Sequence, residues 1–285
     1  QQSQQAYRLY IKDLLLEPIL AQDIEWPEIM QPVLVLRPSG KLHDTQIGLK
    51  KNQVNYVLTR FSDLSWQGHG SIPTVNNISG ALSWQPTSGR LELDGENTTL
   101  APQGLPPVNF AQANAAFEWK ELSHGLRISM ERLVLSHPDF IVSARGALDE
   151  PFTPASRHLQ VTGEFSADNA AKWLPYIPSQ YLKPKLNHWL KHAIKRIDKL
   201  SGQLTINGAL ADFPFDNQPG EFSITSRFTG MDLLFNKKWP LIRDIDTYIN
   251  LNKRTLDFDV LHANLNGIMA SQANLRINDL GMDKE

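Results

Sequence analysis

Two histidines are the residues whose spacing most resembles a metal site. His188 and His192 lie four residues apart, so on a helix they share one face that is able to hold a metal ion. No third ligand follows at metal-site spacing, and lysines surround the pair. We therefore interpret both histidines as part of a solvated polar face.

Paired carboxylates are the other arrangement that suggests chemistry. Asp244 with Asp246, and Asp257 with Asp259, have the separation of a general acid and base, but each pair falls on the polar side of a strand pattern. The segment Ser39-Gly40-Lys41 lacks the preceding glycine of a phosphate loop, and the sequence contains no Gly-x-Ser-x-Gly nucleophile turn. The sequence therefore predicts no enzyme, no catalytic residue, no metal and no cofactor.

The composition excludes further functional classes of protein. The chain has 285 residues, of which 41% are hydrophobic and 20% charged, and its net charge is −2. A partner nucleic acid is not expected, because it requires a basic surface. Cysteine is absent, which removes disulfides and thiol catalysis. No apolar run approaches the roughly 18 residues of a membrane span, and no signal peptide is visible. Because the chain starts at Gln1, we expect a fragment or a processed form, with its membrane anchor in the missing part.

Most of the chain alternates apolar and polar residues with a period of two, as half-buried strands do. The alternation is clear over 221–228, 203–207, 244–252 and 256–260, and turn residues interrupt it at hairpin spacing. A faint repeat of three short strands begins at Ile78, Ala113 and Ile245. Repeated meanders predict an elongated antiparallel protein.

Two regions predict helix instead. In residues 6–20 the apolar side chains Tyr7, Tyr10, Ile11, Leu14 and Leu15 recur at helical spacing, and 24–36 is expected to hold a second short helix. Between about 168 and 197 a basic amphipathic helix is expected, with Ser179 as a cap. Its apolar face is formed by Leu182, Leu186, Trp189, Leu190, Ala193, Ile194 and Ile197.

These helices are too few to cover the apolar sides of so many strands. Either two sheets pack face to face in a closed sandwich, or the apolar side is left for a ligand. The basic helix likewise has two interpretations, a cap on the sheet with its lysines in water or a contact with anionic lipid headgroups. The pattern alone leaves both alternatives open.

Several motifs resemble the AsmA-like family of the YhdP type. They are Leu64-Ser65-Trp66 followed by 72–82, the segments 173–178 and 189–194, Gly208 with Phe213-Pro214-Phe215-Asp216, and Trp239-Pro240 with Ile242. They occur in order and cover roughly residues 60 to 280. The family has a glycine turn after the amphipathic helix, where this chain has Lys195-Arg196-Ile197-Asp198.

The resemblance implies a mostly β fold, an elongated twisted antiparallel sheet forming a U-shaped, repeating β-groove with two short helical insertions. Its expected segments are a helical start over 1–60, groove repeats over 61–166, the amphipathic insertion over 167–200 and a further repeat over 201–285. It implies a periplasmic, inner-membrane-anchored protein of a Gram-negative envelope that moves glycerophospholipids between inner and outer membranes. Outer-membrane or periplasmic proteins are the further partners that it allows.

On this interpretation the apolar side of the strands binds acyl chains. The expected lining residues are Leu82, Trp84, Leu91, Leu93, Phe117, Trp119, Leu126, Ile128, Met130, Leu204, Ile206, Phe222, Ile224, Phe228, Ile249, Leu251, Leu256, Phe258 and Val260. The alternative is a non-enzymatic scaffold or adhesion module in which the same side chains form a closed core. A glycan-binding β-protein is a weaker third interpretation, because no cluster of Trp and Asn supports it.

Overall fold

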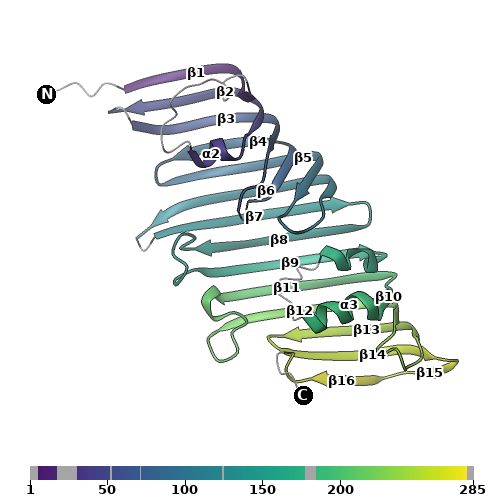
Figure 1. The fold of residues 1–285 in the computed structure, drawn as a ribbon. Coiled ribbons are helices and arrows are strands. Elements are labelled where there is room, and N and C mark those ends of the chain that lie inside the picture. Colours follow the sequence, from purple (N-terminus) through teal and green to yellow (C-terminus); the bar gives the residue numbers. More distant parts are fainter. Residues whose placement is uncertain are drawn as a thin grey trace. The chain divides into compact units, whose positions relative to one another are not determined.

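The computed structural model describes residues 6–17, 31–51, 53–70, 72–123, 125–176 and 184–280. The chain divides into two compact units, Gln1–His137 and Pro138–Glu285. Both consist mainly of antiparallel strands, which confirms the expected mostly β, antiparallel class with short helical insertions (Figure 1). The unit boundary falls inside the predicted segment 61–166, and the segment limits at 60, 166 and 200 stay predictions.

The first unit is a meander in which each strand pairs with the next along the chain. Its strands are β1 (Ala6–Leu15), β2 (Ser39–Lys50), β3 (Gln53–Trp66), β4 (Thr74–Gln85), β5 (Ser88–Ala101), β6 (Val108–Leu122) and β7 (Gly125–His137). The short helix α2 (Gln31–Val35) precedes β2 and agrees in part with the helix expected over 24–36. The N–H of Gln67 donates to the carbonyl of Leu36 at 2.8 Å, which ties the segment after α2 to the end of β3.

The second unit continues the same plan with one insertion. Its strands are β8 (Phe140–Asp149), β9 (His158–Asp168), β10 (Ile194–Arg196), β11 (Lys199–Ala209), β12 (Gly220–Leu233), β13 (Ile242–Asn252), β14 (Thr255–Leu265), β15 (Ile268–Ala270) and β16 (Ala273–Ile277). The 3-10 helices η2 (Ala170–Tyr176) and η4 (Leu210–Asp212) and the helix α3 (Pro184–Ala193) complete it. The main sheet order is β8-β9-β11-β12-β13-β14, while β10 pairs with β12, and β15 and β16 pair with β14.

The helix predicted over 6–20 is wrong for Ala6–Leu15, which form strand β1. Tyr7, Leu9 and Ile11 also alternate with period two, so the segment satisfies both patterns. Pairing along β2 satisfies the backbone groups and places Tyr7 opposite Leu49 and Leu9 opposite Ile47. This tertiary contact overrides the helical spacing. Residues 18–30 lie outside the described residues.

The second predicted helix is correct for η2 and α3 but wrong at its end. Ile194 to Arg196 form β10, where Ile194 pairs with Leu233 and Arg196 with Asp232. Arg196 also forms ion pairs with the carboxylates of Asp198, Asp232 and Asp244, which hold this segment extended against β12. Residues 177–183, including the expected cap Ser179, lie outside the described residues.

Four strands of the first unit each contain a residue that interrupts the regular strand conformation. Asp44, Asp63, Asn77 and Asn97 each have a positive φ, in β2, β3, β4 and β5 respectively, and register shifts accompany those of β2, β3 and β4. Asp and Asn tolerate this conformation, and bulges bend strands and increase their twist. Phe61 is only 6% exposed beside the bends. Asn77 and Asn97 are exposed at these bends, whereas Phe61 packs with Val75 and Ile78 in a buried cluster.

Candidate functional site

The strand register places every expected lining residue of the first unit on one face of its sheet. Leu82 of β4 pairs with Leu91 of β5, Leu91 pairs with Phe117 of β6, and Phe117 pairs with Met130 of β7. Directly opposite residues share a face, and so do residues two apart on one strand. The apolar face of unit 1 therefore contains Leu82, Trp84, Leu91, Leu93, Phe117, Trp119, Leu126, Ile128 and Met130.

The same holds for the second unit. Leu204 of β11 pairs with Ile224 of β12, Ile224 with Leu251 of β13, and Leu251 with Leu256 of β14. The apolar face of unit 2 therefore contains Leu204, Ile206, Phe222, Ile224, Phe228, Ile249, Leu251, Leu256, Phe258 and Val260. Alternation in the sequence was sufficient to group them, because strand pairing preserves the face from strand to strand.

The exposure of these side chains is intermediate without exception. A closed sandwich buries the central residues of its inner face, whereas here each expected lining residue keeps part of its surface accessible. Within the described residues the apolar faces therefore pack along the sheet, side by side, and lack a complete second layer.

Sequence reasoning missed part of the apolar face of unit 1. Leu9 of β1 pairs with Ile47 of β2, Ile47 with Val57 of β3, and Val57 with the expected lining residue Trp84. The face therefore extends over the strands from β1 onward. Residues 7–11 alternate with period two, which predicts a strand, but the same segment also has apolar residues at helical spacing.

The helical insertion covers part of the apolar face of unit 2. Ala170 of η2 and Ile197 after β10 form a buried cluster with Met231, Ile245 and Ala263. The expected lining residues Phe228 and Val260 pack against this cluster, so the insertion covers the strand ends beside them. Figure 1 shows α3 beside β12 and β13 and away from β16. Whether the basic helix caps the sheet or contacts lipid headgroups stays a prediction.

Phe215 closes the opposite end of the same face. Its side chain is fully buried, 0% exposed, against Gly208 and Gly220, which pair with each other across β11 and β12. The ammonium of Lys253 donates to the carbonyl of Phe215 at 2.6 Å, and Phe213 packs on Phe222 with ring centroids 4.8 Å apart. The apolar face of unit 2 thus has a covered region at each end of the strands.

Charged side chains on neighbouring strands form ion pairs on the opposite, polar face. Arg90 of β5 forms ion pairs with Glu92, Glu118 and Glu131, and these carboxylates raise the pKa of its guanidinium. Hydrogen bonds cross neighbouring strands, whose polar residues face each other directly.

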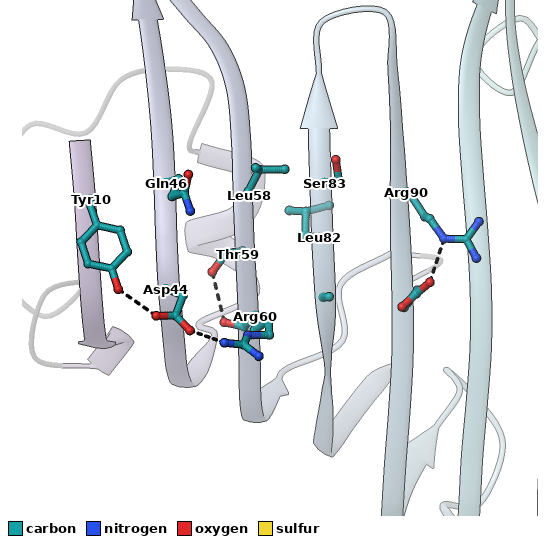
Figure 2. Close-up of a pocket in the computed structure, with 11 residues that line it drawn as sticks. Tyr10, Asp44, Gln46, Leu58, Thr59, Arg60, Leu82, Ser83 and Arg90 are labelled. Carbon is teal, nitrogen blue, oxygen red and sulfur yellow. Dashed lines mark hydrogen bonds and ion pairs between the residues drawn. The ribbon is translucent and has the colours of Figure 1, made fainter. Parts of the chain in front are cut away.

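A hollow of about 580 Å³ lies on the polar face near β1 to β5 (Figure 2). The hydroxyl of Tyr10 donates to Asp44 at 2.8 Å, and the guanidinium of Arg60 also binds Asp44. Both contacts lower the pKa of Asp44, with Arg60 contributing most, while the same carboxylate raises the pKa of Tyr10. Leu82 is the only expected lining residue in this hollow, so it is a solvated surface feature distinct from the apolar face.

One arrangement on the polar face resembles catalytic machinery that the sequence did not predict. His43 Nδ1 lies 2.9 Å from Asp13 Oδ1, and His43 Nε2 lies 2.9 Å from Ser62 Oγ. The order Asp–His–Ser is that of a hydrolase triad, and only the pairing of β1, β2 and β3 brings it together. The Asp13 side chain is 66% exposed, whereas a triad aspartate is buried. Ser62 lies inside strand β3 beside the bend at Asp63, and not at the strand-to-helix turn of a hydrolase nucleophile.

The other residues weighed for chemistry have structural partners. The rings of His188 and His192 stack with centroids 4.1 Å apart, and Asp257 pairs with Arg276, which lowers the pKa of that carboxyl. Within the described ranges, no three His, Cys, Asp or Glu side chains are grouped to hold a metal ion. None of the described helices has the length and apolar character that crossing a membrane requires.

Comparison with known proteins adds the family context. The family model described as YhdP protein matches residues 1–285. A curated protein of Escherichia coli (strain K12), the intermembrane phospholipid transporter YhdP, is 23% identical over 261 residues. The match covers 87% of this chain and 20% of that protein, so the chain spans about a fifth of the relative's length. No solved structure matches the chain.

Proposed function

The chain belongs to the YhdP protein family, and from that premise we propose that its apolar faces carry the acyl chains of glycerophospholipids. The Escherichia coli relative is named an intermembrane phospholipid transporter. On this proposal each apolar face is the floor of a groove that is U-shaped in cross-section, and the lipid headgroup stays in water at its open edge. The expected lining residues are the acyl-chain contacts.

The observation that carries the proposal is the half-buried state of every expected lining residue. Each methylene withdrawn from water contributes about 0.8 kcal/mol, so exposing one sixteen-carbon chain costs about 12 kcal/mol. A continuous apolar floor removes most of that cost. Partly accessible Leu, Ile, Phe, Trp and Val side chains supply such a floor, and a ligand completes their burial.

Three of the buried hydroxyl groups of the described residues are already bonded internally. Thr98 donates to the carbonyl of Asn77 at 2.8 Å, Ser226 to that of Ile249 at 3.1 Å, and Thr247 to that of Asp259 at 3.1 Å. These hydroxyl donors are therefore not available to fix a passing lipid at one position. A path along which no site binds much more tightly than the next permits sliding.

The proposal includes no covalent step. Asp13, His43 and Ser62 are on the polar face, away from the acyl path, and lack the buried aspartate of a working triad. We place the protein in the periplasm, joined to the inner membrane through an anchor outside these residues. Glycerophospholipid is the ligand, outer-membrane or periplasmic proteins are further partners, and nucleic acid is not one.

Native mass spectrometry with lipid extraction tests the proposal. The purified chain is expected to carry phospholipid, and removing it with detergent should expose apolar surface that binds a hydrophobic dye. A lipid-free chain that binds no dye, together with full protection of the lining residues from labelling, would instead indicate a scaffold with a closed core.

A further inference from the structure

Aromatic rings on the apolar faces lie over glycines of the neighbouring strand. Trp119 of β6 pairs directly with Gly89 of β5, and Phe165 of β9 pairs directly with Gly202 of β11. A methyl group placed on Gly89 would meet the Trp119 ring at less than 3.0 Å, and one placed on Gly202 would meet Cζ of Phe165 and the carbonyl oxygen of Thr225, both at 2.5 Å. Each ring therefore leans across the strand beside it and occupies the space that a side chain at the glycine would fill.

Gly89 shows this geometry most directly. The two atoms nearest to a methyl group placed on it are Cζ2 and Cε2 of Trp119, ahead of the carbonyl oxygen of Ser83 at 2.6 Å. The indole is half-buried, and it lies in the middle of a row of lining residues that includes Ile128. If a side chain occupied the space above Gly89, the indole would have to point away from the sheet, because side chains stand roughly perpendicular to strands.

We propose that Gly89 and Gly202 set the depth of the acyl path by seating the rings of Trp119 and Phe165 against the sheet. The inference rests on the proposed function and names the residues that determine how thick a lipid the path accepts. Rings seated in this way add apolar contact to the floor without narrowing the path. A β-carbon at the glycine lifts the ring into the path and removes cross-section.

The polar face supplies a matched control. Gly48 of β2 pairs with Tyr56 of β3, and the three heavy atoms nearest to a methyl group placed on Gly48 are ring atoms of Tyr56, the third of them at 2.7 Å. A steric conflict with a facing aromatic ring therefore also occurs on the polar face, without the carbonyl oxygen that lies near Gly89. Gly48→Ala should reproduce the effect on stability but leave the path untouched.

The experiment compares the chain with Gly89→Ala, with Gly89→Ala/Trp119→Leu and with Gly48→Ala. Each protein is loaded with a diacyl phosphatidylethanolamine or its single-chain lyso form, and bound lipid is counted by native mass spectrometry. Gly89→Ala should weaken diacyl binding at least about fourfold, the ratio equivalent to one methylene at about 0.8 kcal/mol, and weaken lyso-lipid binding less. The double variant should regain diacyl binding, and Gly48→Ala should retain it.

Equal diacyl binding by Gly89→Ala and the unchanged chain would overturn the inference, and so would an equal loss in Gly48→Ala. A double variant that stays defective would show that Gly89 serves only the backbone near Ser83. If Gly89→Ala does not fold, the comparison is repeated with Gly202→Ala and with Gly202→Ala/Phe165→Leu. If neither this double variant nor Gly89→Ala/Trp119→Leu folds, the inference is also refuted. An unchanged chain that binds no phospholipid would refute the proposed function itself.

Discussion

Introducing one charge on the apolar face distinguishes experimentally between an open lipid path and a closed core. Ile224 and Thr225 are neighbours on β12 that face opposite sides of the sheet. Ile224 lies between Leu204 and Leu251 on the apolar face, and Thr225 is exposed on the polar face. Introducing Asp at each position gives the same new charge on the same strand, so the difference between the two variants reports the face alone.

The expected magnitudes follow from the geometry of the path. An acyl chain spans about half of a bilayer core of roughly 30 Å, and at about 4.8 Å per strand it contacts about three strands. A carboxylate at residue 224 therefore affects every lipid position that includes β12. If about three methylenes lose apolar contact at about 0.8 kcal/mol each, binding at those positions weakens about 60-fold.

The effect on folding distinguishes the two architectures. In an open path the new carboxylate reaches water, so Ile224→Asp should lower the free energy of unfolding by about 1–3 kcal/mol through lost side-chain packing. In a dry core an unpaired charge costs much more and would exceed the marginal stability of the fold. Urea unfolding and lipid counting by native mass spectrometry measure the two quantities on the same samples.

We expect Ile224→Asp to fold and to carry less lipid, and Thr225→Asp to match the unchanged chain in both measurements. If Ile224→Asp does not fold while Thr225→Asp does, the closed-core scaffold is the better interpretation. A folded Ile224→Asp protein with its full lipid content would show that this residue does not line the path.

Four further substitutions test other parts of the structure. Phe258→Asp on β14 should also leave a folded protein with reduced lipid, measured by phosphorus content after extraction. Arg196 lowers the pKa of Asp232, whose side chain is only 11% exposed. The stability that this ion pair contributes is complete above the pKa of Asp232 in the unfolded chain, near 3.8. It is lost as the pH falls through the lower pKa of Asp232 in the folded protein. Asp232→Asn should therefore lower stability by about 1–2 kcal/mol at neutral pH and flatten the acid dependence below pH 4 in urea titrations. Ser62→Ala and His43→Ala should leave lipid content unchanged, and the unchanged chain should release no fatty acid from phospholipid; sustained release that Ser62→Ala abolishes would contradict the absence of catalysis.

The sequence alone determined which side chains share a face. Alternation with period two is set by the pleat of a strand, so Leu204 and Ile206, or Leu256 and Phe258, were grouped correctly before any pairing was known. It also determined the mostly β class, because the alternating stretches greatly outnumber the two helical ones. The family motifs likewise lay in the residues themselves.

Tertiary structure decided the features that depend on a partner strand. The segment 6–15 fits both periods, and only its pairing with β2 makes it a strand. The register alone seats Trp119 on Gly89 and aligns Asp13, His43 and Ser62, residues that are far apart in the sequence. Whether an apolar face is covered also depends on which segments pack over it. A local pattern records which way a side chain points, but its contacts are set by strands and helices distant along the chain.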